Sequence, residues 1–197
     1  VDIGGGLCYF LWERDHEDEC LVINMNSGEQ DALRRSLNQY GNLFIRSNKA
    51  ISIIEKIRAK ADSFVDEMVS AIDTFGIPSK VRGHEEYTEG DILLVHSDGA
   101  NSSKTSYISR DVVTKNAHLI DKYKVRISIL VPQNGEAGVK PEKGYRSMST
   151  PHLVYPGQVD SFSYLNIGFF DNETEAENFR KYMMCKLPRF MMRTTYS

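Results

Sequence analysis

The sequence predicts an α+β fold, with a mixed, mainly antiparallel sheet and several packed helices. Short β-branched runs are separated by turn residues; the clearest is a hairpin of Asp91–Ser97, a turn at 98–103 and a strand over 105–109. Two stretches, 49–61 and 172–187, carry apolar residues at helical spacing. Hydrophobic residues make up 41% of the 197 residues, which is enough for a core, and no apolar run is long enough to span a membrane.

The N-terminal region is expected to form a hairpin. The Gly4–Gly6 loop leads into an apolar run over 7–14, and the strand-like run Cys20–Met25 follows a polar tip. We expect Phe10 and Trp12 to lie in the core. A phosphate-binding loop is disfavoured, because a strand rather than a helix follows the glycines.

The next region is predicted as a polar loop over 26–47, with a possible short strand over 40–45, leading into a helix. Asn48 is expected to cap this helix, which runs from Lys49 to about residue 61. Its spacing predicts a core face of Ala50, Ile53, Ile54, Ile57 and Ala61.

The second half of the chain is predicted to alternate short elements. A helix is expected over 115–123 with Leu119 and Ile120 buried, then a β-branched strand over 125–131 and a mobile loop over 132–149. Strands are expected over 153–155 and 161–170.

The last clear helix should begin after Asn172, because Glu175 three residues later completes a capping-box pattern. One face of it carries Ala176, Phe179, Met183 and Leu187, and Pro188 should stop or kink it.

Charge is distributed unevenly along the chain. The net charge is −3, but residues 101–150 hold nine Lys and Arg against four Asp and Glu, whereas residues 1–100 hold ten against 18. The basic residues concentrate in Tyr107–Ser128, which indicates a localised anionic partner. The alternative is a solvated helix face followed by an edge strand.

The sequence contains little that indicates catalysis. No Gly-x-Ser-x-Gly, Walker-type or Pro-Pro-containing methyltransferase motif occurs, and the five histidines are scattered. His84–Glu86 is a poor metal site, because adjacent residues rarely converge on one ion. Three cysteines form no even disulfide framework, which favours a reduced, cytoplasmic setting.

Several runs, in order along the chain, are similar to one family. They are Val1–Asp15, Ile45–Asn48, Tyr107–Asn116, Leu119–Val125 and Ser163–Asp171 with the helix after it up to Phe190. This order resembles the C-terminal target-recognition region of bacterial restriction-modification adenine-specific DNA methyltransferases. Pro188 and the run 146–150 depart from the family pattern.

The resemblance implies two parts: residues 1–47 as a hairpin and linker from the end of a catalytic domain, and 48–197 as a recognition domain truncated at its C-terminus. It implies a sequence-specific DNA-recognition role with double-stranded DNA and the parent's own N-terminal methyltransferase domain as partners. S-adenosylmethionine is implied for the parent enzyme, whereas this chain is expected to hold no cofactor, to perform no catalysis and to span no membrane. The chain begins at Val1 rather than Met, so we expect a piece of a longer protein.

The DNA-contact candidates divide into three groups. Arg110, Lys115 and Asn116 are candidates for base edges, although Asp111 could pair with Arg110 and Asn116 could cap a helix. Lys122, Lys124 and Arg126 are candidates for phosphate contacts. Lys140, Lys143 and Arg146 lie in the predicted mobile loop and could order on DNA.

Three alternatives stay open. Tyr107 and Tyr123 could stack on a displaced base, but half-buried sheet positions are commoner for such residues. The chain could instead be a protein-interaction or scaffold domain, whose acidic first half docks a basic partner. A third possibility makes it an enzyme through His84 and Glu85.

Overall fold

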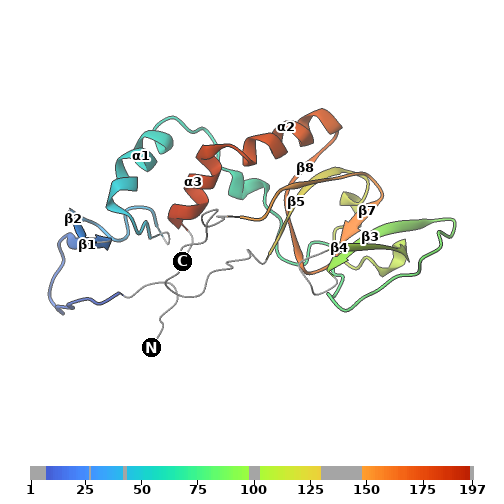
Figure 1. Ribbon diagram of the computed structural model, residues 1–197, viewed down its shortest axis with the longest axis horizontal. Helices are drawn as coiled ribbons and strands as arrows, with labels where there is room; N and C mark the ends of the chain where they lie inside the picture. Colours follow the sequence, from blue (N-terminus) through green and yellow to red (C-terminus); the bar gives the residue numbers. More distant parts are fainter. Residues whose placement is uncertain (1–7, 27, 42–43, 98–102, 130–147, 196–197) are drawn as a thin grey trace. The chain divides into compact units, whose positions relative to one another are not determined.

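The computed structural model describes residues 8–26, 28–41, 44–97, 103–129 and 148–195. They fall into two compact units. The first unit comprises Val1–Asp62, Gln133–Ser147 and Phe190–Ser197, and the second comprises Ser63–Pro132 and Met148–Arg189. The α+β class is confirmed, and all but one of the strand pairings are antiparallel (Figure 1). The described strands form three small sheets rather than one.

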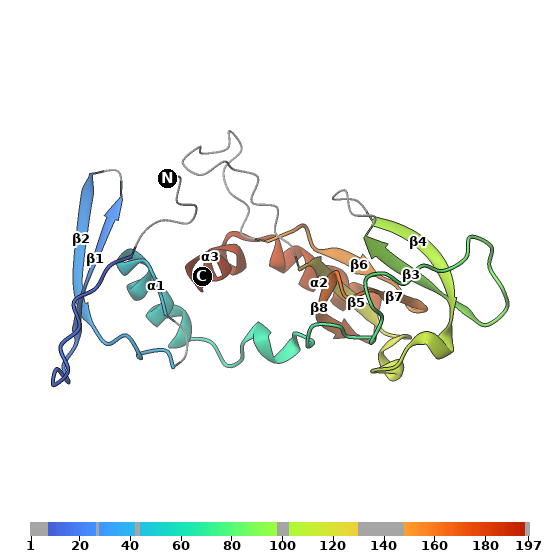
Figure 2. The ribbon, with the colours of Figure 1, turned by 90° about the horizontal axis from the view of Figure 1, so that it is seen from below.

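The first unit contains a hairpin of β1 (Cys20–Asn26) and β2 (Glu29–Arg35), with helix α1 (Asn48–Arg58) beside it (Figure 2). The predicted partner of β1 was wrong: residues 8–19 form no strand, and β2 lies in the expected loop. Gly28 has a φ of +86°, as tight hairpin turns require, and the polar sequence of β2 hides its strand character. The core assignment of two aromatic residues was also wrong, because Phe10 and Trp12 are 85% and 71% exposed.

Asn48 joins α1 to the hairpin through its side chain. Its Nδ2 donates to the Val22 and Asp31 carbonyls at 2.8 and 3.2 Å, and its Oδ1 accepts from Arg35 Nε at 3.0 Å. The predicted cap was wrong. Asn48 is the first residue of the helix, and Ser47 holds the cap position without a side-chain hydrogen bond. The predicted boundary at 47/48 falls within this hydrogen-bonded group.

Helix α1 buries Ala50, Ile51 and Ile54 against Ile45, while Ile53 stays 43% exposed, so the predicted core face was partly wrong. Phe190 and Met191 pack against the same cluster. They come from α3 (Lys186–Thr195), whose first turn holds Pro188, where a missing N–H costs little.

The second unit holds a sheet in the order β4-β3-β7, formed by β3 (Asp91–Ser97), β4 (Ser103–Ser109) and β7 (Gln158–Asp160). The predicted β3–β4 hairpin is confirmed, with Leu94 paired to Ser106, and β7 adds the single parallel pairing. The core of this unit comprises Phe75, Ile77, Ile92, Leu94, Ile108, Val113, Ile120 and Val159.

The other sheet of this unit places β5 (Tyr123–Ser128) between β6 (His152–Val154) and β8 (Tyr164–Phe170). Helix α2 (Glu173–Met183) packs on it, and Asn172 Oδ1 accepts from the Glu175 amide at 2.9 Å, which confirms the predicted cap. Ala176 and Met183 are buried as predicted.

The predicted helix over 115–123 is wrong. The segment contains only the 3-10 turn η3 (Ala117–Leu119), and η2 (Arg110–Val112) precedes it. Asn116 adopts a left-handed φ of +50°, which an α-helix cannot include, so the apolar pair at 119 and 120 is placed by one tight turn instead. A further 3-10 turn, η1 (Val65–Met68), contacts β8.

Candidate nucleic-acid interface

Two of the predicted DNA contacts lie in exposed ion pairs. Arg110 pairs with Asp121 and Lys122 pairs with Asp171, and both cationic side chains are partly exposed. Because Asp121 and Lys122 are adjacent, the two cations lie in the same region of the second unit. Exposed ion pairs contribute about 0–1 kcal/mol, so each cation can exchange its carboxylate for a phosphate at little cost.

Lys115 and Asn116 contact a neighbouring segment of the protein instead. Lys115 Nζ lies 2.8 Å from Asp73 Oδ2, and Asn116 Nδ2 donates to the Thr74 carbonyl at 2.8 Å. That segment includes Gly76, where an added Cβ would meet Thr114 Oγ1 at 2.0 Å. The Asn116 amide is engaged by the Thr74 carbonyl, so we do not retain Asn116 as a base contact.

The two basic residues of β5 are buried, which corrects their assignment as phosphate contacts. Lys124 is 0% exposed, and its Nζ donates to the carbonyls of Ile120 and Lys122 at 2.9 and 2.8 Å. A third carbonyl, that of Leu119, lies at 3.3 Å. Arg126 is 9% exposed, and its guanidinium stacks over the ring of Tyr164 at 4.6 Å. Neither charge is presented to a DNA backbone.

A buried acid compensates these cations. Burial raises the pKa of Asp160 to about 6, while Arg126 and Lys124 oppose the rise. Burial lowers the pKa of Lys124 to about 8, and the carboxylates of Asp160 and Asp121 oppose that change. Asn166 Nδ2 donates to both oxygens of Asp160 at 3.1 Å. The group is a structural polar cluster that joins β5, β7 and β8.

The remaining predicted residues give no support for DNA contact. Lys140, Lys143 and Arg146 lie outside the described residues. Tyr107 packs edge-on against Tyr87 at 5.5 Å, and Tyr123 against Tyr155 at 6.0 Å, so both tyrosines already have aromatic partners.

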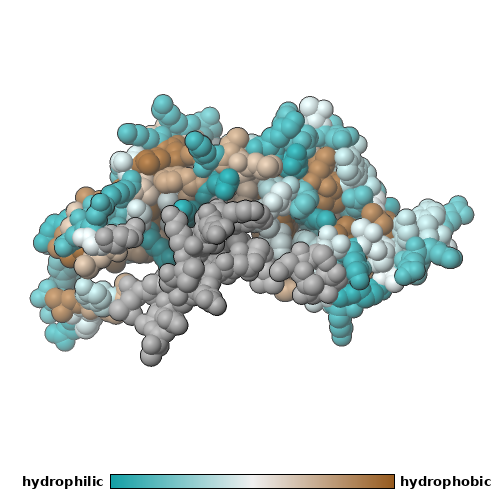
Figure 3. All heavy atoms as spheres, viewed as in Figure 1, coloured by the Kyte–Doolittle hydropathy of each residue, from teal (hydrophilic) through white to brown (hydrophobic). Residues whose placement is uncertain are grey.

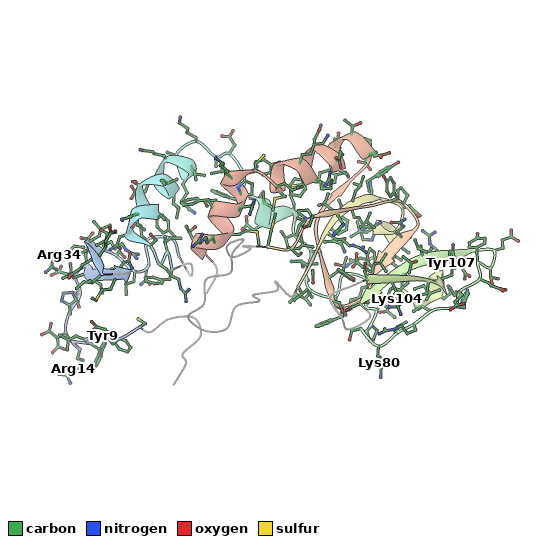
Figure 4. The ribbon with its side chains drawn as sticks, viewed as in Figure 1. Tyr9, Arg14, Arg34, Lys80, Lys104 and Tyr107 are labelled. Atoms are coloured by element: carbon green, nitrogen blue, oxygen red, sulfur yellow. The ribbon has the colours of Figure 1, made fainter. Side chains whose placement is uncertain are left out.

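A basic group that the sequence did not reveal lies beside the β3–β4 hairpin. We call Lys80, Arg82 and Lys104 the basic corner; all three are exposed, and none forms an ion pair with a described carboxylate. Figure 4 shows Lys104 on β4 and Lys80 on the loop beside that strand.

Arg82 links the two lysines. Its guanidinium donates to the carbonyl of Ser79, next to Lys80, at 2.6 Å, and to that of Ser97 at 3.1 Å. Ser97 pairs with Ser103, the neighbour of Lys104. These backbone contacts hold Arg82 in place without neutralising it, so no described carboxylate is paired with the charge of the corner. Because Lys104 is 22 positions from Arg82, only strand pairing reveals the grouping.

Metal ligation and membrane insertion find no support among the described residues. They contain no group of three His, Cys, Asp or Glu placed to hold a metal. No helix among them is long and apolar enough to cross a membrane. No family model, curated protein or solved structure matches the chain.

Proposed function

We propose that the chain is the sequence-recognition part of an adenine-specific DNA methyltransferase, and that its second unit binds duplex DNA. The observation that carries the proposal is the basic corner, where three exposed cations lie together without a carboxylate partner among the described residues. Such a group suits phosphates, whose contacts supply much of the affinity for DNA.

Arg110 and Lys122 form a second group of cations on the same unit. Strand β4 separates Lys104 from Arg110 by six residues, which is roughly 20 Å of extended chain. That spacing lets the two groups meet phosphates several base pairs apart, since successive phosphates of one strand lie about 3.4 Å apart along the helix axis. Bases that lie between the contacted phosphates would be read by side chains located between the two groups of cations.

In this proposal the chain itself is not an enzyme. The parent would supply the methyltransferase domain, bind S-adenosylmethionine there and work in the cytoplasm, with or without an associated cleavage activity. The resemblance of the ordered runs from Ile45–Asn48 to Ser163–Asp171 supports this placement.

Selection from a randomised duplex pool, followed by fluorescence anisotropy, tests the proposal. We expect an enriched consensus and an affinity that falls steeply with salt, as phosphate contacts require. Binding without any consensus would reduce the function to non-specific DNA association. No binding at low salt, by a chain with native circular dichroism, would contradict the proposal.

A separate test addresses the parent enzyme. The full-length protein, incubated with S-adenosylmethionine labelled in its methyl group, should transfer label to adenine in DNA that contains the selected consensus. Label transfer only to protein, or none at all, would contradict the methyltransferase assignment while leaving DNA binding by this chain intact.

A further inference from the structure

The first unit exposes an unusual number of large apolar side chains. Tyr9, Phe10, Leu11 and Trp12 are consecutive and are 82%, 85%, 97% and 71% exposed. On β1, alternate residues Leu21, Ile23 and Met25 are 52%, 47% and 68% exposed. We call these seven residues the apolar hairpin surface; Figure 3 shows brown spheres among teal ones in this part of the molecule.

The three β1 residues share one face of the hairpin, because side chains alternate along a strand. The opposite side is held by α1, through the hydrogen bond from Asn48 to the Val22 carbonyl. A two-stranded hairpin is marginal alone and needs an apolar face covered. Large exposed apolar patches mark interaction sites in folded proteins.

The charges around the surface are acidic. Residues 8–41 carry Arg14, Arg34 and Arg35 against seven carboxylates: Glu13, Asp15, Glu17, Asp18, Glu19, Glu29 and Asp31. Arg35 is buried, and its guanidinium donates to the Ile45 carbonyl and to Asn48 Oδ1, so it adds little positive potential outside. Arg14 is paired with its neighbour Asp15 at 3.2 Å and Glu29 with Lys49 at 3.8 Å, while exposed Arg34 lies opposite Leu21 in the hairpin. The excess of carboxylates therefore lies in residues 13–19.

This charge decides between possible occupants. DNA phosphates and anionic lipid headgroups would be repelled by the carboxylates. A second copy of the chain would bring an identical acidic rim against this one, and like charges across an interface are unfavourable. A cationic partner satisfies both the apolar residues and the rim.

We propose that the apolar hairpin surface docks a separate protein domain that presents an apolar ridge bordered by lysine and arginine. Leu21, Ile23 and Met25 form the centre of the contact, and the carboxylates of residues 13–19 meet the basic border. The described strands β1 and β2 pair only with each other, so each also keeps an open edge that a partner strand can join. This inference does not depend on DNA binding by the second unit.

Trp12 is the single tryptophan of the chain, so its fluorescence reports on this surface alone. The probe is a nine-residue strand-forming peptide of alternating Leu and Lys, compared with a Leu and Glu peptide of equal apolar content. We expect the Lys peptide to shift Trp12 emission to the blue in a saturable, salt-sensitive manner, and the Glu peptide to bind at least tenfold more weakly.

Two variants and one control make the test specific. Ile23→Asp should weaken the Lys peptide at least tenfold, and Leu11→Asp should weaken it as well. Because Leu11 is 97% exposed, that change cannot act through misfolding. Ile53→Asp, a 43% exposed apolar position on α1, is the matched control and should leave binding unchanged.

Four outcomes would overturn the proposal. They are equal binding of the two peptides, unchanged binding by the Leu11→Asp variant, concentration-dependent dimers in sedimentation velocity, and a blue shift of Trp12 on vesicles with anionic lipid. Quenching of Trp12 by duplex DNA, lost in the Leu11→Asp variant, would assign the surface to nucleic acid instead. None of these results would bear on the basic corner.

Discussion

Lysines and arginines of the second unit lie in two contrasting environments, the interior at β5 and the surface at the basic corner. On β5, Lys124 and Arg126 are buried and tie the sheet together. At the basic corner, Lys80 and Lys104 are exposed and bind no described carboxylate. Two of the cations that cluster in the sequence, Lys124 and Arg126, are therefore absent from the surface, whereas the basic corner joins cations that are far apart in the sequence.

The difference arises from what surrounds each ammonium group. Lys124 Nζ is held by backbone carbonyls of the tight turns before β5, and Asp160 supplies a buried opposite charge. Lys104 is exposed near the start of β4 and forms no ion pair with a described carboxylate. A buried cation without compensation would cost several kcal/mol, so the two positions should respond very differently to the same change.

Charge reversal at the two lysines should give the largest contrast. Lys124→Glu would place a carboxylate against carbonyl oxygens, and we expect the free energy of unfolding to fall by about 4 kcal/mol or more. Lys104→Glu should change it by no more than about 0.5 kcal/mol. Urea unfolding followed by circular dichroism measures both. Equal stabilities of the two variants would contradict the assignment of Lys124 to the interior.

The pH dependence of stability should also show that Lys124 is buried. Burial lowers the pKa of Lys124 to about 8 from the ordinary lysine value of 10.5, so folding opposes the charged form. Below pH 8 both folded and unfolded chains carry the charge, and the cost is fully present. As pH rises from 8 towards 10.5 the folded chain loses the proton first, so stability should rise, by at most about 3 kcal/mol.

Other groups also titrate in this range, so the measurement is a difference. The free energy of unfolding of wild type minus that of Lys124→Met should increase between pH 8 and 10.5. A flat difference would mean that Lys124 keeps an ordinary pKa and is open to solvent.

Asn116 should behave as a structural residue. Asn116→Ala removes the hydrogen bond to Thr74 and places a non-glycine Cβ at a φ of +50° without the local polar compensation of Asn. We expect a loss of about 2 kcal/mol in unfolding free energy and unchanged DNA affinity in the folded protein. Asn116→Gly should lose less, because glycine tolerates that backbone. A variant with full stability and weakened DNA binding would return Asn116 to the interface.

The smallest effect is expected at the exposed ion pairs. Asp121→Asn with Asp171→Asn frees Arg110 and Lys122 and should alter stability by about 0.5 kcal/mol or less, because both pairs are exposed. DNA affinity at low salt should rise a few fold, since two negative charges are removed beside the cations. Unchanged DNA affinity would show that these cations take no part in binding.

The sequence predicted the elements whose pattern is local. The strand Asp91–Ser97, the cap at Asn172 and the helix over α1 follow from β-branched runs, a capping box and apolar spacing, and all three are present. Strand β2 was missed because its residues are mostly polar and its position depends on the turn at Gly28.

The site was less predictable for a physical reason. Burial of Lys124 depends on the backbone carbonyls of residues 119–122, which the turns before β5 bring to its ammonium group, and on Asp160, which is 36 positions away in sequence. The basic corner depends on a loop that lies against the β3–β4 hairpin. A cluster of charged residues in the sequence does not show which carbonyls or loops lie beside each charge in the fold. Strand pairing and turn geometry show this.

The salt dependence of DNA binding by a Lys80→Glu, Lys104→Glu variant tests the central claim most directly. Lys56→Glu, Lys60→Glu on and just after α1 is the control, with the same change of charge on the first unit. Both proteins are titrated into a duplex of the selected consensus at several salt concentrations, and the slope of log K against log salt is compared. If both lysines of the corner neutralise phosphates, the slope should become shallower by about 1.8 in magnitude, at about 0.9 for each contact. The control should keep the wild-type slope, and an equal slope for all three proteins would contradict the assignment of the basic corner to DNA.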